Sequence, residues 1–131
     1  MIRRITVADV MSTALITTTA DAGLAEAADL LVRHGISGLP VLDAAGGLVG
    51  IVTEQDCLRV ACRRDYYQGG ARTVGEAMTR DVVSIDADAD IMTAIDAFLR
   101  HSFRRLPVLR AGRLVGLVSR TDALRVMRRF V

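Results

Sequence analysis

The sequence contains no lysine and no tryptophan, and its 131 residues include only two cysteines and five aromatic side chains. All 17 residues counted as Lys or Arg are arginine, so the chain has neither a lysine for a Schiff base nor the lysine of a phosphate-binding P-loop. Cys57 and Cys62 lie five positions apart on a predicted helix, point in different directions and form no disulfide within it. No further cysteine or pair of histidines completes a metal site, so the sequence predicts two reduced thiols and no metal.

Long hydrophobic runs are also absent. No apolar run approaches the roughly 18 residues of a transmembrane helix, and the segment from Met1 to Asp9 lacks the apolar core of a signal peptide. We therefore expect a cytoplasmic protein with no membrane span. A hydrophobic content of 51%, with 11 glycines and 2 prolines, indicates a folded chain, and its length suits one compact domain.

The net charge of +2 hides an asymmetry between the two halves of the chain. Residues 1–65 carry 6 arginines and 8 acidic residues, a net −2, whereas residues 66–131 carry 11 and 7, a net +4. The planar guanidinium group suits phosphate, although a soluble arginine surface, favoured by GC-rich codon usage, explains most of these residues.

The chain repeats itself. The block "RHGISGLPVL" at 33–42 matches "RHSFRRLPVL" at 100–109 with an offset of 67, and "LVGIVTEQDCLRV" at 48–60 matches "LVGLVSRTDALRV" at 114–126 with an offset of 66. The missing residue falls in a loop, where a deletion is tolerated. Two copies of about 55 residues, each too short to bury a good core alone, predict a single core that both share in a pseudo-twofold unit.

The domain boundaries follow from the repeat. We assign 1–65 to the first copy, with a core at 7–61, and 74–131 to the second, with a core at 74–127. Residues 66–73 form the linker between them.

Both copies have the same pattern of predicted elements, β-α-β-β-α, which indicates an α+β fold. An extended piece (15–18 or 82–85) precedes an amphipathic helix, and Asp21 and Asp88 are expected to cap these two helices. Two apolar runs separated by a glycine-containing turn then predict a hairpin, and a second helix follows it. The ranges are 22–34 and 89–101 for the first helices, and 39–42 with 48–52 and 106–109 with 114–118 for the hairpins.

Each second helix begins with a hydroxyl residue followed three positions later by an aspartate: Thr53 and Asp56, then Ser119 and Asp122. One interpretation is a capping box, in which the two side chains satisfy free backbone N–H groups. The other is a nucleotide site, because a helix N-terminus attracts phosphate and a carboxylate accepts from ribose hydroxyls. The two roles are compatible. A glycine in each preceding strand, Gly50 or Gly116, indicates a bulge or the close approach of a ligand.

These features resemble a tandem pair of cystathionine-β-synthase (CBS) domains, a Bateman module. The resemblance rests on "HGISGLPVLD", "HSFRRLPVL", "GIVTEQD" and "GLVSRTD" in register, and it covers about residues 7–127. It implies two CBS repeats that bind AMP, ADP, ATP or S-adenosylmethionine between them and regulate a partner or an attached domain. It also implies a homodimer formed through the helices, and no catalytic activity.

The resemblance assigns roles to particular residues. Asp56 and Asp122 hold ribose hydroxyls, and segments 12–18 and 79–85 border the base. Phosphate contacts fall to Thr53, Ser119, Thr121, Arg104 and Arg105. Ser37, at the position equivalent to Arg104 in the first copy, is implied to lie against the nucleotide held by the aspartate of the other copy.

The two prospective sites differ in charge. Arg120, Arg104 and Arg105 surround the Asp122 motif, whereas Glu54 lies within the Asp56 motif and repels phosphate. We therefore expect the Asp122 site to bind the more highly charged nucleotide and the Asp56 site to be weaker or empty.

Two alternatives remain open. The chain is a structural dimerisation module whose motifs only cap helices, or a nucleic-acid-binding protein that uses its basic tail at 125–130 with Arg110 and Arg113. No helix-turn-helix motif and no zinc-ligand spacing supports the nucleic-acid alternative.

The remaining candidate residues have structural roles. His34 and His101 are expected to stabilise helix ends, and no catalytic set is visible. Met11 and Met78 are expected to fill the core.

Overall fold

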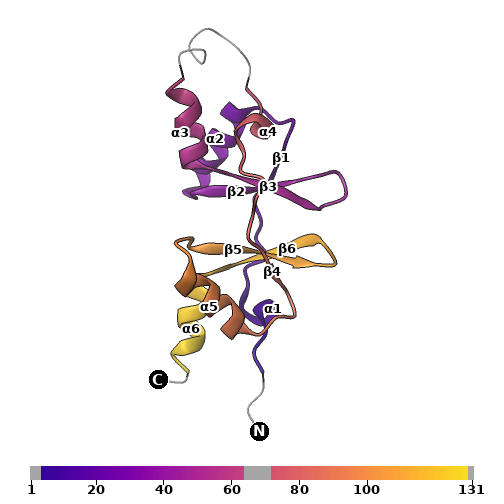
Figure 1. Ribbon diagram of the computed structural model, residues 1–131, viewed down its shortest axis with the longest axis vertical. Helices are drawn as coiled ribbons and strands as arrows, with labels where there is room; N and C mark the ends of the chain where they lie inside the picture. Colours follow the sequence, from indigo (N-terminus) through magenta and orange to yellow (C-terminus); the bar gives the residue numbers. More distant parts are fainter. Residues whose placement is uncertain (1–3, 64–71, 130–131) are drawn as a thin grey trace. The chain divides into compact units, whose positions relative to one another are not determined.

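The computed structural model describes residues 4–63 and 72–129 and confirms the β-α-β-β-α order of both repeats, with a short helix before each (Figure 1). Most of the predicted linker 66–73, with Tyr66 and Tyr67, lies outside the described residues, as does Phe130 at the end of the basic tail. The elements are α1 (Val7–Val10), β1 (Thr18–Thr19), α2 (Leu24–His34), β2 (Gly38–Leu42), β3 (Leu48–Thr53), α3 (Glu54–Ala61), α4 (Val74–Ala77), β4 (Ile85–Asp86), α5 (Ile91–Arg100), β5 (Arg105–Arg110), β6 (Arg113–Ser119) and α6 (Arg120–Met127).

The strands form two three-stranded sheets of the same topology. In the order β1-β2-β3, the first pair is parallel and the second is the predicted antiparallel hairpin; β4-β5-β6 repeats this arrangement. The register of each hairpin shifts at equivalent places, between Val41 and Leu42 and between Val108 and Leu109. The helix between the first two strands of each sheet is the crossover that parallel pairing requires.

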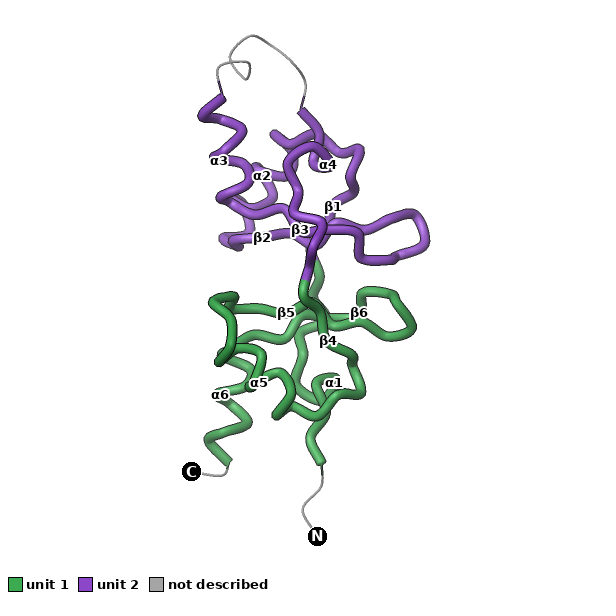
Figure 2. The backbone as a smooth tube through the Cα atoms, viewed as in Figure 1, with its two compact units in different colours: residues 1–15, 83–131 green, residues 16–82 purple. Residues whose placement is uncertain are grey.

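The chain divides into two compact units that do not coincide with the two sequence copies (Figure 2). Unit 1 comprises residues 1–15 and 83–131, and unit 2 comprises residues 16–82. The short helix that precedes each repeat therefore folds into the unit built by the other repeat.

Backbone hydrogen bonds hold these exchanged segments in place. In unit 1, the N–H of Val7 donates to the carbonyl of Ala89 at 2.9 Å, and Ser12 and Leu117 exchange bonds of 2.8 and 2.9 Å. The segment that contains α1 is therefore part of unit 1, together with the second repeat.

Unit 2 is built in the same way. The N–H of Val74 donates to the carbonyl of Ala22 at 2.9 Å, and Ile51 and Thr79 exchange bonds of 2.9 and 2.8 Å. The segment of α4 is therefore the counterpart of the segment of α1.

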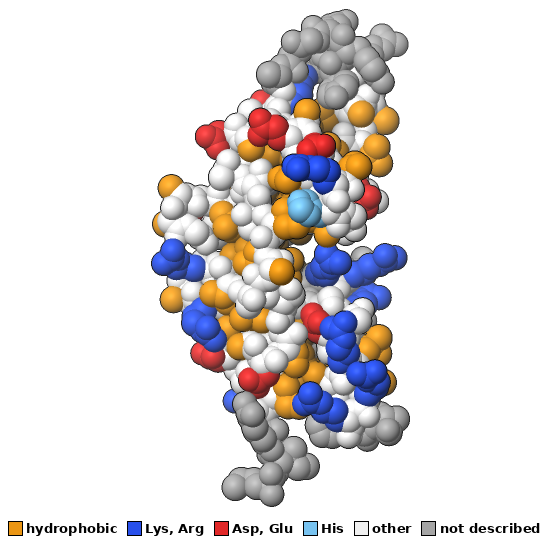
Figure 3. Space-filling model, turned by 180° about the vertical axis from the view of Figure 1, so that it is seen from behind, with side chains coloured by type: hydrophobic (Ala, Val, Ile, Leu, Met, Phe, Trp, Pro, Cys, Tyr) orange, Lys and Arg blue, Asp and Glu red, His pale blue; other side chains and the backbone are white. Residues whose placement is uncertain are grey.

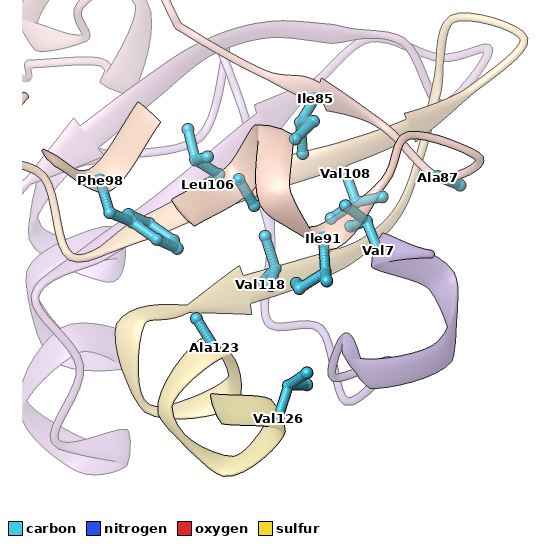
Figure 4. Close-up of a cluster of buried hydrophobic side chains, with 11 residues drawn as sticks. Val7, Ile85, Ala87, Ile91, Phe98, Leu106, Val108, Val118, Ala123 and Val126 are labelled. Atoms are coloured by element: carbon cyan, nitrogen blue, oxygen red, sulfur yellow. The ribbon is translucent and has the colours of Figure 1, made fainter. Parts of the chain in front are cut away.

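The buried hydrophobic residues form two clusters, one in each unit, so the prediction of a single shared core is wrong. The physical reason is the exchange: each repeat gains the apolar surface that it lacks alone from a short helix of the other sequence copy. Val7 in unit 1 and Val74 in unit 2 are both fully buried. Figure 4 shows Val7 beside Val108 and Ile91 in the core of unit 1.

The N-cap of the first helix in each repeat lies two residues after the expected one, so the capping predictions for Asp21 and Asp88 are wrong. Gly23 is the N-cap of α2, and Asp90 is the N-cap of α5, where its Oδ1 accepts from the N–H of Met92 at 2.8 Å. Asp21 accepts instead from the hydroxyl of Thr19 at 2.7 Å. The expected apolar faces are nevertheless buried at Leu24, Ala27, Leu31, Ile91, Ala94 and Phe98.

Gly50 and Gly116 mark a close approach, as expected, but what approaches is the chain itself. A Cβ atom on Gly116 would lie 2.5 Å from Sδ of Met11 and 2.9 Å from the carbonyl oxygen of Ser12. At Gly50 the corresponding contacts come from Met78 and Thr79. These glycines let the exchanged segments cross the hairpins, and both methionines pack against the cores, as predicted.

Candidate functional site

The hydroxyl–aspartate motif of unit 1 lies where β6 ends and α6 begins. Ser119 is the extended N-cap residue of α6, and its Oγ accepts from the N–H of Asp122 at 3.1 Å. In return, Oδ2 of Asp122 accepts from the N–H of Ser119 at 2.8 Å. The two side chains thus satisfy two backbone donors that a helix N-terminus leaves free.

The motif of unit 2 has the same geometry between β3 and α3. Oδ2 of Asp56 accepts from both the N–H and the hydroxyl of Thr53 at 2.9 Å, and the Thr53 hydroxyl oxygen lies 3.2 Å from the N–H of Asp56, which donates to it. The capping interpretation is therefore confirmed for both motifs.

The second oxygen of each aspartate faces an arginine one helical turn later. Oδ1 of Asp122 lies 2.9 Å from Nη1 of Arg125, and Oδ1 of Asp56 lies 3.2 Å from Nη1 of Arg59. The side chain of Asp122 is 12% exposed and that of Asp56 only 4%, whereas both arginines are largely exposed. A ligand hydroxyl thus has easier access to the carboxylate of Asp122.

The backbone brings two more predicted residues to the motifs. The N–H of Arg120 donates to the carbonyl of Arg104 at 3.0 Å, and the N–H of Glu54 donates to the carbonyl of Ser37 at 2.9 Å. Arg104 therefore lies beside the Asp122 motif in unit 1, and Ser37 lies beside the Asp56 motif in unit 2. The position of Ser37 follows directly from the repeat, because both residues precede equivalent strands.

The side chain of Arg120 bonds to the segment that follows α5. Its Nε donates to the carbonyl of Phe103 at 3.1 Å and its Nη2 to the carbonyl of His101 at 3.3 Å, just beyond the end of α5. In unit 2 the equivalent position is Glu54, and α2 ends instead at Gly35, which has a φ of 61°. Arg120 thus supplies donors near a helix end that lacks a glycine cap, a role that the sequence did not indicate.

The remaining predicted residues of unit 1 are on the surface. The side chains of Thr121, Arg104 and Arg105 are all exposed. Figure 3 shows arginine side chains gathered over one side of unit 1, the lower unit in that view, with few acidic side chains among them. This side of unit 1 is therefore positive, and the exposed Arg104 and Arg120 add positive charge beside the Asp122 motif.

The histidines and cysteines show no catalytic arrangement within residues 4–63 and 72–129. His34 lies in the last turn of α2, and His101 follows α5 with its ring stacked on Phe103 at 4.9 Å between centroids. Burial, and to a lesser degree the Asp56 carboxylate, raises the pKa of the Cys57 thiol. The described part of the chain has no metal-binding cluster of His, Cys, Asp and Glu and no helix of the length and apolarity needed to cross a bilayer.

Comparison with known proteins agrees with this geometry. The CBS domain family model matches the chain twice, at residues 7–63 and 74–129. An uncharacterized 17.7 kDa protein of Acidianus ambivalens is 35% identical to this chain over 105 residues. The matched region covers 79% of this chain and 62% of that relative's length.

Two solved structures are similar over nearly the whole chain. The CBS domain pair of protein MJ0100, in complex with methylthioadenosine and S-adenosyl-L-methionine, is 28% identical with a TM-score of 0.80 and covers 98% of this chain and all of its own. CBSX2 in complex with AMP, a CBS-pair protein from Arabidopsis thaliana, is 30% identical with a TM-score of 0.82, over 95% of this chain and 97% of its own.

Proposed function

We propose that this chain, which belongs to the CBS-domain family, is a regulatory module that binds an adenosyl ligand and signals its level to a protein partner. The observation that carries the proposal is the Asp122 carboxylate, held by Ser119 at the amino end of α6 with its Oδ1 oriented toward an exposed side chain. One of the two similar CBS pairs described above is in complex with AMP, and the other with methylthioadenosine and S-adenosyl-L-methionine. The proposed role is regulatory rather than catalytic. We propose that the protein acts in the cytoplasm.

The chemistry of an adenosine nucleotide suits this motif. The ribose diol needs an acceptor, and Oδ1 of Asp122 provides one when the exposed Arg125 turns toward solvent. The hydroxyls of Ser119 and Thr121, with the exposed guanidinium groups of Arg104 and Arg105, are suited to phosphate oxygens. The helix N-terminus adds a favourable potential for the same anion.

The two motifs are proposed to differ in affinity. Asp56 is more deeply buried than Asp122, and Glu54 places a negative charge next to Thr53. The deeper burial limits the access of a ribose hydroxyl to Asp56, and the charge of Glu54 repels phosphate. We therefore propose that the Asp122 motif takes AMP, ADP, ATP or S-adenosylmethionine, and that the Asp56 motif binds more weakly.

Signalling follows from differential binding. A ligand that binds one arrangement of the repeats, or of two chains, better than another shifts the population toward that arrangement. We propose that two copies of the chain associate through their helices, so that ligand changes either the homodimer or the surface offered to the partner.

Calorimetric titration of ligand-stripped protein with AMP, ADP, ATP and S-adenosylmethionine tests this proposal. We expect saturable binding of at least one compound and its loss in Asp122→Ala. Asp96→Ala is the matched control, because Asp96 makes an equivalent 2.9 Å ion pair with Arg100 on the surface of α5. Silence from all four ligands, or unchanged binding by Asp122→Ala, contradicts the proposal.

A purely structural dimerisation module is the second candidate, and the complete capping boxes favour it. If the aspartates act only as caps, Asp122→Ala lowers stability by about 1 kcal/mol and the wild-type chain binds none of the four ligands. The same titration, combined with urea unfolding of the two variants, separates the candidates.

A further inference from the structure

The two main helices of unit 1, α5 and α6, have an apolar groove between them, with a volume of about 250 Å³. Phe98 and Ala123, which are buried in the core, form its floor. Leu99 and Leu124 line it with 82% and 55% of their surface exposed. The other lining residues are Ile95, Met127 and Arg120. Apolar side chains that are this exposed and lie along one groove indicate an interaction surface.

The chemistry of the lining favours a helix as the occupant. Arg120 is the only lining residue with a polar side chain, and its Nε and Nη2 already donate to backbone carbonyls. The backbone N–H and C=O groups of an occupant must therefore be satisfied within the occupant itself, as they are in a helix. An extended segment would instead need a free strand edge, whereas this groove lies between two helices.

The part of the chain that forms the groove is strongly positive. Residues 91–129 contain nine arginines and two aspartates, a net +7 with histidine neutral. Both aspartates are already paired, Asp96 with Arg100 and Asp122 with Arg125. The excess arginines therefore lack acidic partners on these helices.

Two of the excess arginines lie close to the groove. Arg128 follows Leu124 by one helical turn, and the carbonyl of Arg104 accepts from the N–H of Arg120 at 3.0 Å. Both side chains are exposed, and neither forms an ion pair within residues 4–63 and 72–129. An occupant with carboxylates beside its apolar face would complement them.

The equivalent surface of unit 2 lacks both features. Its residues 24–63 contain five acidic residues and three arginines, a net −2. The repeat places Ala28 and Ala61 at the positions of Ile95 and Met127. The basic apolar groove is therefore specific to unit 1 and is not a consequence of the repeated fold.

We infer that the groove of unit 1 is the docking site for an acidic amphipathic helix of a protein partner. Apolar side chains of that helix, three and four residues apart, enter the groove, and its carboxylates face Arg104 and Arg128. The inference names the class of the partner in the proposed function, and it rests on that function for the existence of a protein partner. A second copy that packs on α5 and α6 competes for the same residues.

Fluorescence anisotropy with designed peptides tests the groove. The probe is a labelled peptide of about 18 residues, long enough to span α6, with leucines on one helical face and glutamates elsewhere. A second peptide has lysine in place of every glutamate. In low-salt buffer without any adenosyl compound, we expect saturable binding of the glutamate peptide and binding of the lysine peptide that is weaker by roughly tenfold or more.

A pair of matched variants locates the binding. Leu99→Ala/Leu124→Ala should raise the dissociation constant of the glutamate peptide by roughly tenfold or more. Val32→Ala/Leu58→Ala is the control, because these residues occupy the equivalent positions of unit 2 and are 80% and 64% exposed. It should leave the constant unchanged. Circular dichroism verifies that both variants are folded.

A charge reversal provides an independent measurement. Arg128→Glu should weaken the glutamate peptide by roughly two- to fivefold and strengthen the lysine peptide, and both effects should fade in high salt. Equal effects on the two peptides contradict the proposed contact.

Other results overturn the inference. Absent binding, equal binding of the two peptides, or unchanged binding by Leu99→Ala/Leu124→Ala excludes this docking mode. A dimer that no peptide concentration dissociates, but that Leu99→Ala/Leu124→Ala makes monomeric in sedimentation, assigns the groove to a second copy. A single-stranded oligodeoxynucleotide that binds more tightly than the glutamate peptide, regardless of the leucines, assigns the arginines to nucleic acid. Since no sample contains an adenosyl compound, none of these results bears on ligand binding.

Discussion

At the scale of single residues, Asp56 and Asp122 stabilise the chain as well as forming the proposed site. Each carboxylate caps a helix and meets an arginine. We expect Asp56→Ala and Asp122→Ala to lower the free energy of unfolding by about 1 kcal/mol, with the larger loss at the more buried Asp56. Urea unfolding measures this. Asp96→Ala, which removes only a surface ion pair, should cost less than about 0.5 kcal/mol, and an equal loss at Asp96 contradicts the role of the caps.

The thiol of Cys57 provides a second prediction at this scale. Burial and the Asp56 carboxylate raise its pKa, so less thiolate is present at a given pH. Since the thiolate is the reactive form, Cys57 should be alkylated by iodoacetamide more slowly than the exposed Cys62, as followed by peptide mass spectrometry at pH 8. The rate at Cys57 should continue to rise as the pH increases, and Asp56→Asn should accelerate it. Equal rates at the two cysteines contradict this account.

At the scale of elements, the glycines of β3 and β6 determine where the exchanged segments cross. Gly116→Ala brings a methyl group against Met11 and a backbone carbonyl that cannot turn away. We expect a loss of roughly 1–3 kcal/mol in thermal or urea unfolding, and a similar loss for Gly50→Ala. Gly38→Ala is the control, since its Cβ meets neighbours at ordinary distances of 3.5 Å or more. A loss at Gly38 as large as that at Gly116 refutes the steric explanation.

Most elements were predictable from the sequence because their patterns are local. Two apolar runs separated by a glycine-containing turn identified each hairpin, and helical periodicity identified the buried faces of α2 and α5. Helix starts were less accurate, because Asp21, Asp88 and Asp90 are all acceptable caps by residue type. Residue type alone therefore does not decide which residue caps the helix, and in α2 the cap is Gly23. The bonds from Arg120 to carbonyls 17 and 19 residues away are likewise not encoded in any local pattern.

At the scale of the whole molecule, the exchange of α1 and α4 could not be predicted from the repeat. The two copies have nearly the same sequence pattern, so a short helix meets equivalent residues whether it packs on its own copy or on the other copy. The sequence therefore does not distinguish the two arrangements. The sequence therefore predicted one shared core, whereas the structure has two clusters, each with a helix from the other copy. The capping boxes, by contrast, were predictable from the sequence, because the hydroxyl residue and the aspartate of each motif lie within one helical turn.

The exchange predicts where a core substitution acts. Val7→Ala should destabilise unit 1 by roughly 2 kcal/mol, because Val7 is fully buried in its core. Hydrogen–deuterium exchange should then increase mainly in residues 83–129, although 16–63 are nearer in sequence. Val74→Ala is the matched variant and should act mainly on residues 16–63. The opposite distribution, with Val7→Ala acting on 16–63, contradicts the exchange.

The hydroxyl–aspartate motif of unit 1 is the proposed adenosyl site of this CBS pair. Titration of uniformly ¹⁵N-labelled, ligand-stripped protein with AMP, followed by amide chemical shifts, tests it most directly because it locates the ligand. We predict saturable shifts of the amides of residues 119–122, larger than those of residues 53–56, and their loss in Asp122→Ala. Unchanged amides at 119–122 while AMP saturates another part of the chain, or no shift anywhere, would contradict the claim.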